Sequence, residues 1–364
     1  MIRAVLAAAV LALTATAATA QTAPPADPYD PGRKIVAELQ KIVTPNGVQE
    51  TLEVELGGAK QVINVRGANR DNPILIFIHG GPGSVEMPIA WSFQRPWEDV
   101  FTVVQWDQRG AGRSYLLNDP KLIAPTLKPE RYRDDAIELI EYLQKRYGQK
   151  KVFVMGHSWG SVVGLSVAAK RPDLLYAYIG MGQVIDFREN ERLGLEWTIE
   201  QAKKDGNAQA VAELEAIKPY PGEGALLPEK TAIERKWSIY YGALAANRRD
   251  ADFYFRAPRI SPEYTPADRK AWDDGSGLTI GALWPQLADI SLKTVNRIDT
   301  PVILFMGRHD YTTPAPIADA WLKRLKAPKK QMVWFENSAH LPMIEEPGLT
   351  FAALLKDVRP LAGN

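Results

Sequence analysis

The sequence predicts an α/β fold: an eight-stranded, mostly parallel sheet with helices on both faces and an inserted helical domain. Three observations carry this prediction. Two segments of partly alternating apolar and polar residues come first, and six continuous apolar runs follow, with helical patterns between them. About 110 residues separate the fourth of these runs from the fifth, far more than an ordinary connection needs. That stretch is therefore expected to form a domain of its own.

The first two predicted strands form an antiparallel hairpin. Apolar and polar residues partly alternate over Thr51–Leu56 and Lys60–Val65, and two glycines lie between these segments. The apolar runs that follow are typical of parallel strands, which are buried on both faces. They are Ile74–Ile78, Phe101–Val104, Val152–Met155, Leu175–Ile179, Val302–Met306 and Met332–Phe335.

The clearest helical pattern between the strands covers Arg131–Tyr147. Its apolar residues share one stripe, its acidic residues come early, its basic residues come late, and Gly148 follows as a stop signal. Helices in such connections cross over to the faces of the sheet.

The insertion is expected to be a helical cap over residues 183–290, between core segments 46–182 and 291–364. Helical patterns cover Glu189–Lys204, Ala208–Ile217 and Glu229–Asn247, with a Pro/Gly break at 218–228. Four tryptophans in it are expected to form the core of a small domain packed on the sheet, and only secondarily a surface that lines the substrate site. They are Trp197, Trp237, Trp272 and Trp284.

The first 20 residues read as a cleavable secretory signal. Arg3 precedes the apolar run Ala4–Leu13, and Ala18-Thr19-Ala20 resembles a cleavage site. A membrane anchor is the alternative, but it needs about 20 consecutive apolar residues. Residues 21–45 are expected to be an N-terminal leader, mobile where four prolines precede Arg33. The mature protein is therefore expected in the periplasm or outside the cell, and not in the membrane.

Composition excludes several kinds of partner. Forty-four basic residues balance forty-three acidic ones, so a nucleic acid or an anionic membrane is not favoured. There is no cysteine and no HExxH motif, and the Gly-rich stretch at 79–83 lacks the lysine of a P-loop. We expect neither a metal nor a cofactor, and a small molecule or short peptide as substrate.

Ser158 is the expected nucleophile. It is the centre of Gly156-His157-Ser158-Trp159-Gly160, after one predicted strand and before the helical stretch Ser161–Lys170. This is the strand, sharp turn and helix of a nucleophile elbow, in which the glycines leave room for a strained backbone. The competing interpretation is a glycine-rich turn with a helix-capping serine.

His340 is the expected base and Asp310 its carboxylate partner, because each follows one of the last two strands. The order Ser158, Asp310, His340 is the order found in enzymes with such an elbow. Asp310 could also cap a helix at Thr312–Leu325, and His340 could be a loop histidine without a role. The histidines within the glycine motifs, His79 and His157, suit supporting roles in turns.

The tetrahedral intermediate of such a reaction needs hydrogen-bond donors that are already in place. In His79-Gly80-Gly81-Pro82-Gly83, after the third strand, the glycines allow backbone N–H groups to approach a substrate closely. We expect the N–H groups of Gly81 and Trp159 to form the oxyanion hole.

Taken together, the motifs resemble the prolyl aminopeptidase (proline iminopeptidase) family of α/β-hydrolases. The resemblance covers Ile74 to about Gly180 and Pro301–Pro347. The motifs are HGGPG at 79–83, WDQRGAGRS at 106–114, GHSWG at 156–160 and GRHD at 307–310.

This resemblance implies the α/β-hydrolase fold, the triad of Ser158, Asp310 and His340, and the two oxyanion donors. It also implies a helical cap whose glutamates recognise a free N-terminus. Within the family the segment that contains Arg109 is a structural turn beneath the active site, so Arg109 and Arg113 are expected to form scaffold ion pairs.

The chain departs from the family where specificity is set. It carries Gly180–Asp186 where family members that release proline have an Arg-Gly-Ile-like segment, and Ser84–Pro88 where a glycine-rich continuation is usual. In the first cap helix Glu191, and after it Glu196, are the candidates to pair with an α-ammonium group. The alternative, favoured for at least two of Glu189, Glu191 and Glu196, is a solvated charged face beside arginines.

The expected function is that of an exported serine hydrolase. It would release an N-terminal residue from short peptides or aminoacyl amides through a covalent acyl-enzyme. A carboxylesterase or amidase for a small neutral substrate is the alternative, because it would use the same triad and differ only in the cap. A ligand receptor on this fold would be favoured by a missing triad residue, and none is missing.

Overall fold

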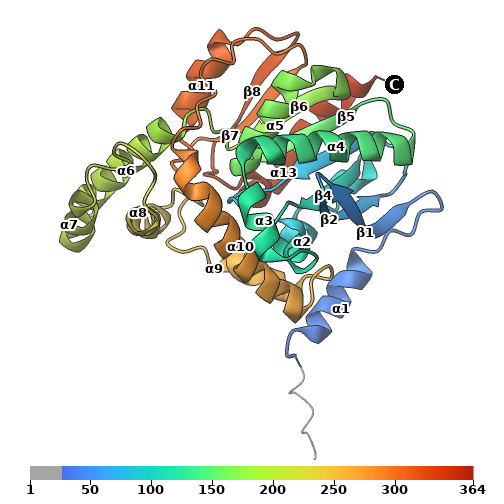
Figure 1. Ribbon diagram of the computed structural model, residues 1–364, viewed down its shortest axis with the longest axis horizontal. Coiled ribbons are helices and arrows are strands. Elements are labelled where there is room, and N and C mark those ends of the chain that lie inside the picture. Colours follow the sequence, from blue (N-terminus) through green and yellow to red (C-terminus); the bar gives the residue numbers. More distant parts are fainter. Residues whose placement is uncertain (1–26, 364) are drawn as a thin grey trace, which may run out of the picture.

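Eight strands form one sheet in the computed structural model, which describes residues 27–363 (Figure 1). The order across the sheet is β1-β2-β4-β3-β5-β6-β7-β8. The two pairs at one edge, β1 with β2 and β2 with β4, are antiparallel, and all the others are parallel. The predicted eight-stranded, mostly parallel sheet is confirmed. The strands are β1 (Val48–Leu56), β2 (Ala59–Gly67), β3 (Ile74–Ile78), β4 (Thr102–Asp107), β5 (Val152–His157), β6 (Leu175–Met181), β7 (Val302–Gly307) and β8 (Lys330–Phe335).

The apolar runs form strands because both faces of the sheet are covered. All residues of β3, β4, β5 and β7 are buried. In β3 the side chains of Ile74, Ile76 and Ile78 enter one hydrophobic cluster, and those of Leu75 and Phe77 enter another. This is the two-residue period of a strand between two cores.

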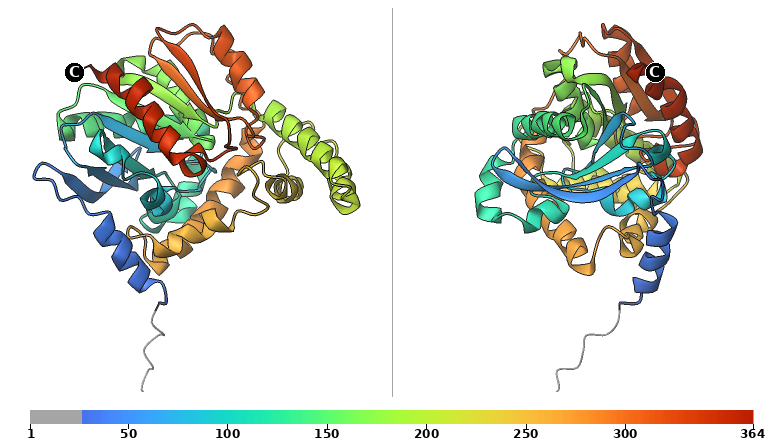
Figure 2. Two further views of the ribbon diagram at one scale, coloured as in Figure 1. Left: turned by 180° about the vertical axis from the view of Figure 1, so that it is seen from behind. Right: turned by 90° about the vertical axis from the view of Figure 1, so that its right-hand side faces the viewer.

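Helices from separate crossovers cover the two faces. Apolar residues of α4 (Pro129–Tyr147), α5 (Trp159–Lys170) and α11 (Ala315–Arg324) belong to the first cluster. Those of α12 (Pro342–Glu345) and α13 (Pro347–Ala353) belong to the second, and Figure 2 shows α13 on the opposite face from α4. Gly148 ends α4 in the left-handed conformation, with φ 68°, at the predicted stop.

The insertion after β6 contains α6 (Phe187–Lys204), α7 (Ala208–Ala216), α8 (Pro228–Tyr240), α9 (Asp252–Arg256) and α10 (Pro266–Leu287). Its first three helices project from the body of the molecule, whereas α10 lies along the body near α2 (Gly112–Leu116) and α3 (Pro120–Ile123) (Figure 1). The insertion therefore has two parts: α6, α7 and α8, which project from the body, and α10, which packs along it.

Two expectations about this region were wrong. The helix predicted for Glu229–Asn247 ends at Tyr240, because Gly242 adopts φ 89° and turns the chain. The 22-residue helix α10, which contains three glycines and Pro285, was not among the predicted helices. Gly275 has a packing role: a Cβ there would lie 2.7 Å from the carbonyl oxygen of Gly110.

The four tryptophans of the insertion do not form one core, contrary to the prediction. Trp237 packs in the small cluster of α6, α7 and α8. Trp284 belongs to the main core, and Trp272, which is a residue of α10, packs with Val62 and Val85. Trp197 is half-buried and stacks on Tyr311 with ring centroids 4.3 Å apart. Trp197, Trp272 and Trp284 thus attach the insertion to the core at separate places, whereas Trp237 packs within the cap.

The N-terminal leader is more ordered than predicted. Helix α1 (Asp30–Leu39) lies within the segment 21–45, and Arg33 donates to the carbonyl of Arg259 at 3.1 Å. The predicted signal, residues 1–20, lies outside the described residues. Between residues 27 and 363, no helix combines the length and apolar character that crossing a membrane requires.

Candidate active site

Ser158 lies on a strained turn between β5 and α5, with φ 54° and ψ −119°. The turn is close-packed: a Cβ at Gly156 would collide with the carbonyl of Gly160, and a Cβ at Gly160 with that of Ile78. Larger residues would therefore crowd the turn, as the sequence predicted. Ser158 is half-buried, whereas its neighbours on both sides are buried.

Asp310 and His340 come together from the loops that follow β7 and β8. Nδ1 of His340 lies 2.9 Å from Oδ2 of Asp310, and both residues are buried. Since an ionised carboxylate only accepts, Nδ1 carries the hydrogen and Nε2 is left as the basic atom. Asp310 also accepts from Thr313, through the backbone N–H at 2.7 Å and the hydroxyl at 2.8 Å. Asp310 thus serves as turn cap and histidine partner at once, as the sequence allowed.

The end of β6 connects the elbow to His340. The N–H of Ser158 donates to the carbonyl of Met181 at 2.9 Å, and the next residue, Gly182, has φ 55°. A Cβ on Gly182 would lie 2.8 Å from Cε1 of His340, so this glycine lets the ring approach. Within residues 27–363, the hydrogen bonds of the His340 ring reach Asp310 and Thr313 but not Ser158 Oγ. Catalytic hydrogen bonds of this kind commonly tighten when substrate binds.

Each of the two expected oxyanion donors is next in the chain to a residue of the elbow or to one that packs on it. Trp159 is the first residue of α5, so its N–H has no acceptor within the helix. Gly81 has φ 107°, and the adjacent Gly80 packs on Ser158, where a Cβ would lie 3.1 Å from the Ser158 Cβ. The oxyanion hole formed by Gly81 and Trp159 stays a prediction.

The turn after β4 supports both of these loops. Gln108 donates from its backbone to Nε2 of His79 at 3.2 Å and from its side chain to the His79 carbonyl at 3.0 Å. The Gln108 side chain also accepts from the indole of Trp159 at 3.1 Å. Burial lowers the pKa of His79 to about 4, so its ring is neutral and its Nε2 can accept.

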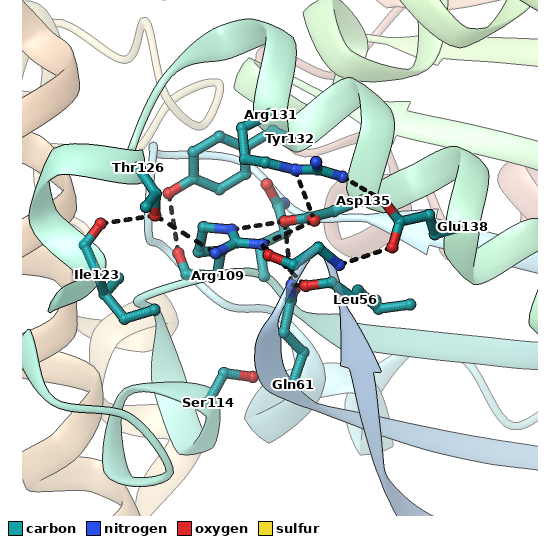
Figure 3. Close-up of polar contacts among 12 residues, drawn as sticks. Leu56, Gln61, Arg109, Ser114, Ile123, Thr126, Arg131, Tyr132, Asp135 and Glu138 are labelled. Atoms are coloured by element: carbon teal, nitrogen blue, oxygen red, sulfur yellow. Dashed lines mark hydrogen bonds and ion pairs between the residues drawn. The ribbon is translucent and has the colours of Figure 1, made fainter.

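Arg109, in the same turn, belongs to a structural network with Asp135, Arg131 and Gln61 (Figure 3). Its guanidinium donates to both oxygens of Asp135 at 2.7 and 2.9 Å, and to the carbonyls of Leu56 and Gly57 at 2.8 and 3.0 Å. Arg109 therefore joins the first hairpin, the turn after β4 and helix α4. It is the scaffold partner that the sequence suggested.

A second buried ion pair lies directly beneath the elbow. Nδ1 of His157 contacts Oε1 of Glu86, and Nε2 of His157 lies 2.9 Å from the carbonyl oxygen of His340. The hydroxyl of Tyr254 donates to the same Glu86 oxygen at 3.3 Å. Burial lowers the pKa of His157, but Glu86 more than offsets this effect and the pKa is raised overall. The sequence marked Ser84–Pro88 only as a departure from the family and gave Glu86 no role.

The expected cap glutamates have different surroundings. Glu191 is buried, where it contacts Nη2 of Arg235 and the hydroxyl of Tyr220. Glu196 lies on the outer face of α6, with a side chain 55% exposed, and pairs with Arg192. Glu189 pairs with the same arginine on that face. Two of the three glutamates therefore form a solvated charged face.

Sequence reasoning missed a second buried cap carboxylate, Glu234. It contacts Nη1 of Arg235 and accepts from the hydroxyl of Thr198 at 3.3 Å. Burial raises the pKa of Glu234, although Arg235 opposes the effect. Glu234 and Arg235 are adjacent on α8, and two neighbouring charges on a helix gave no signal that either is buried.

This cap cluster lies close to the loop that holds Asp310. A Cβ on Gly194 of α6 would lie 3.2 Å from the carbonyl of Tyr311 and 3.6 Å from Oε1 of Glu234. Asn190 donates to the carbonyl of Thr312 at 2.8 Å. Helix α6 is therefore attached directly to the loop that holds Asp310.

The His340 loop is attached to the cap as well. The N–H of His340 donates to the carbonyl of Leu244 at 3.0 Å. Glu345 accepts from the backbone N–H groups of Ala339 and Leu341, both at 3.0 Å, and from that of Ala246 in the cap at 2.6 Å. The carboxylate of Glu345 thus holds both sides of the loop 339–341 around His340, the expected base, and this loop is called the base loop.

A cavity of about 820 Å³ opens on the outer side of the cap, between α6 and the Lys218–Gly222 loop. It is lined by Arg188, Arg192 and Glu196 among others, and not by Ser158, Asp310 or His340. Of the two cap glutamates expected to bind substrate, Glu196 faces this cavity. Among residues 27–363 no group of three or more histidine, cysteine, aspartate or glutamate side chains is placed to hold a metal ion.

Comparisons with known proteins match this fold. The family model described as alpha/beta hydrolase fold matches residues 73–347. A probable aminopeptidase of Bacillus subtilis is 29% identical over 310 residues, covering 84% of this chain and 95% of the relative. A proline iminopeptidase of Neisseria gonorrhoeae is 35% identical over 275 residues, covering 70% of this chain and 78% of the relative. The crystal structure of a Mycobacterium smegmatis proline iminopeptidase superposes with a TM-score of 0.61 at 19% identity, covering 86% of this chain and 99% of the other.

Proposed function

Because this chain belongs to the alpha/beta hydrolase family and is proline iminopeptidase-like within it, we propose that it removes the N-terminal residue from short peptides or aminoacyl amides. The observation that carries the proposal is the 2.9 Å hydrogen bond from His340 to Asp310, beside the elbow of Ser158. With Nδ1 engaged, Nε2 of His340 is the atom that takes the serine proton.

In the proposed reaction, Nε2 of His340 takes the proton of Ser158 as Oγ bonds to the carbonyl carbon of the substrate. The N–H groups of Gly81 and Trp159 bind the negative oxygen of the tetrahedral intermediate. The C–N bond then breaks, and the leaving amine receives the proton from His340. Water, deprotonated by His340, attacks the acyl-enzyme and releases the N-terminal residue, and the proton returns to Ser158.

Labelling with a fluorophosphonate tests the nucleophile. We expect one label on Ser158 in the wild type and none in Ser158→Ala, with an unchanged melting temperature. Ser166→Ala, which changes a half-buried serine two turns further along α5, is the matched control and should label like the wild type. Labelling of Ser158→Ala at the wild-type rate would contradict the proposal.

The buried cap carboxylates support a substrate with a free α-amine. Glu191 and Glu234 share one guanidinium, that of Arg235. The cluster therefore contains two carboxyl groups and one guanidinium, and a second cation could pair with it. A buried ammonium group needs such a partner. We therefore expect kcat/KM to be higher for an amino-acid arylamide than for its N-acetylated counterpart.

A carboxylesterase or amidase for a small neutral substrate is the second candidate. It is favoured by the contacts of Glu191 with both Arg235 and Tyr220, which already occupy both oxygens of that carboxylate. The same pair of substrates decides between the two. A preference for the acetylated arylamide would replace the exopeptidase proposal by this one and leave the triad as proposed.

Export of the protein is proposed on the sequence of residues 1–20 alone. A charged start, an apolar run and small residues before Gln21 are typical of a cleaved secretory signal. We expect the exported protein to begin at Gln21, which intact-mass measurement of a periplasmic fraction can show. A mass that includes residues 1–20 would contradict cleavage.

A further inference from the structure

The buried pair of Glu86 and His157 has a geometry that the proposed reaction does not use. The residue before the nucleophile, His157, places one ring nitrogen against a carboxylate and the other 2.9 Å from the backbone carbonyl of His340. Both of these neighbours are hydrogen-bond acceptors when Glu86 is ionised. A neutral imidazole has only one N–H and could satisfy only one of them.

One proton therefore has to lie between Glu86 and His157. It belongs either to Nδ1 of an imidazolium or to the carboxyl of Glu86, and in both cases Nε2 of His157 keeps its hydrogen and donates to His340. If Glu86 is replaced by a group that cannot hold this proton, His157 can adopt the tautomer with its hydrogen on Nδ1. In that tautomer a lone pair of His157 Nε2 faces the carbonyl oxygen of His340. Glu86 thus determines whether His157 Nε2 donates a hydrogen bond to the carbonyl of His340.

The pair is also connected to the cap. Tyr254 of α9 donates to Oε1 of Glu86 at 3.3 Å, and Oε2 of Glu86 has no partner in the described structure although it is buried. The other groups that face His157 are the neutral ring of His79, the carboxylate of Asp310 and the ring of His340, whose centroid lies 4.8 Å away. A continuous path of contacts therefore runs from the cap to the base loop.

We propose that Glu86 and His157 are positioning residues, which hold the His340 loop through the bond from His157 Nε2 to the His340 carbonyl and connect that loop to Tyr254 of the cap. The proposal rests on the role of His340 as the base. A side chain that acts only through another residue should change the rate of serine activation more than the binding of substrate.

The main test compares His157→Gln, Glu86→Gln, the double variant and Tyr254→Phe with the wild type. We measure the rate of fluorophosphonate labelling against pH, kcat and KM for one arylamide, and the melting temperature. In His157→Gln the labelling rate and kcat should fall by roughly 10- to 100-fold, with KM within about twofold. Glu86→Gln should lose less, since the amide can donate to Nδ1 and preserve the N–H at Nε2.

Two features distinguish positioning from general loss of stability. The double variant should be no slower than His157→Gln, because the two residues act as a unit. The acid limb of the labelling rate should move to higher pH in His157→Gln, because the proton that Glu86 and His157 share beside His340 is no longer retained there. Tyr254→Phe, the mildest change, should slow labelling a few fold.

Glu98→Gln is the matched control. Glu98 is as buried as Glu86 and pairs with Arg66 at 2.7 Å, away from the elbow and the base loop. It should lower the melting temperature without moving kcat or the acid limb. If His157→Gln behaves like Glu98→Gln in these readouts, the proposal is overturned.

A direct measurement keeps the proposal testable if the variants fold poorly. With four histidines in the chain, ¹⁵N spectra of the imidazoles can be assigned using His157→Gln. Nε2 of His157 should remain protonated at every pH at which the protein is folded. Loss of that proton as the pH rises would refute the geometry, whereas failure of Ser158 to label at all would refute the proposed triad and leave this result intact.

Discussion

Two buried ion pairs of this molecule differ in how completely their polar atoms are used. In the network of Arg109 and Asp135, the guanidinium donates to two carboxylate oxygens and two carbonyls, and Arg131 and Gln61 complete the carboxylate (Figure 3). In the pair of Glu86 and His157, Oε2 of the glutamate has no partner among the described residues. A fully satisfied network fixes one structure, whereas a buried acceptor without a partner costs free energy.

The location of each pair agrees with this difference. Among the described residues, the hydrogen bonds of the Arg109 guanidinium join the β1–β2 turn to α4 and to Thr126, and none of them reaches Ser158 or His340. The pair of Glu86 and His157 includes the residue before Ser158, and His157 contacts the backbone of His340. We infer that the first pair serves folding and the second serves the site, and each prediction below tests one side of that contrast.

The largest effect is expected from the triad itself. His340→Ala should lower kcat by about 10⁴-fold or more, and Asp310→Asn by a few powers of ten, with little change in the melting temperature. The exposed neighbour His309→Ala is the matched control and should retain wild-type kcat. Full activity in Asp310→Asn would remove Asp310 from the mechanism.

The next largest effect is on stability, in the Arg109 network. Asp135→Asn leaves a buried guanidinium without its counter-ion and should lower the free energy of unfolding by about 3–5 kcal/mol. The adjacent Asp134→Asn breaks a partly exposed pair with Arg133 and should cost about 1 kcal/mol or less. Denaturant unfolding measures both. Below the unfolding transition, kcat of Asp135→Asn should match the wild type, and a specific loss of kcat would contradict a purely structural role.

A third test concerns Asp107, the last residue of β4, which has an oxygen, Oδ1, without a partner in the described structure. Burial raises its pKa from 3.8 to about 7, although Tyr264 and the N–H of Arg113 oppose the effect. Between pH 4 and 7 the folded state thus keeps a proton that the unfolded state has lost, and stability falls as the pH rises.

Asp107→Asn removes this dependence. Relative to the wild type, its free energy of unfolding should rise with pH across that window, by up to roughly 4 kcal/mol. Unfolding curves at several pH values provide the measurement, and Asp119→Asn, at an exposed cap, is the control. Parallel pH profiles for Asp107→Asn and the wild type would show that Asp107 is ionised when folded.

The smallest effect is expected in the cap. Glu191→Gln should raise KM for a substrate with a free α-amine by about tenfold, through loss of a charge-assisted contact, and barely change the hydrolysis of a neutral acyl ester. Glu196→Gln, on the outer face of α6, is the matched control and should change neither. Equal effects of Glu191→Gln on both substrates would indicate damage to the buried cluster and not loss of amine recognition.

Local signals were sufficient wherever short-range chemistry decides the structure. All six apolar runs became strands. Four of these strands, β3, β4, β5 and β7, are wholly buried in a sheet covered on both faces, whereas β8 is a half-buried strand at its edge. The elbow was predicted from its glycine pattern. These glycines are required because a Cβ at Gly156 would collide with Gly160, and a Cβ at Gly160 would collide with Ile78 of β3. Arg109 could be assigned to the scaffold only from the resemblance, since its partner Asp135 is 26 positions away.

Predictions failed where long-range packing outweighs local propensity. Helix α10 contains glycines that discourage a helix in isolation, yet the close approach of Gly275 to Gly110 accounts for one of them. Likewise, the proline-rich leader contains α1, which is attached to a residue more than 200 positions later.

The sequence alone therefore determined the sheet, the elbow and the identity of the residues proposed as nucleophile, acid and base, because these depend on hydrophobic period, turn chemistry and chain order. Only the tertiary structure decided which charges are buried and which groups they meet. It placed Glu191 beside Arg235, left Glu196 in solvent and brought Glu86 beneath the elbow. A charged residue has the same local pattern in either environment, and the free energy that separates the two arises from partners distant in the chain.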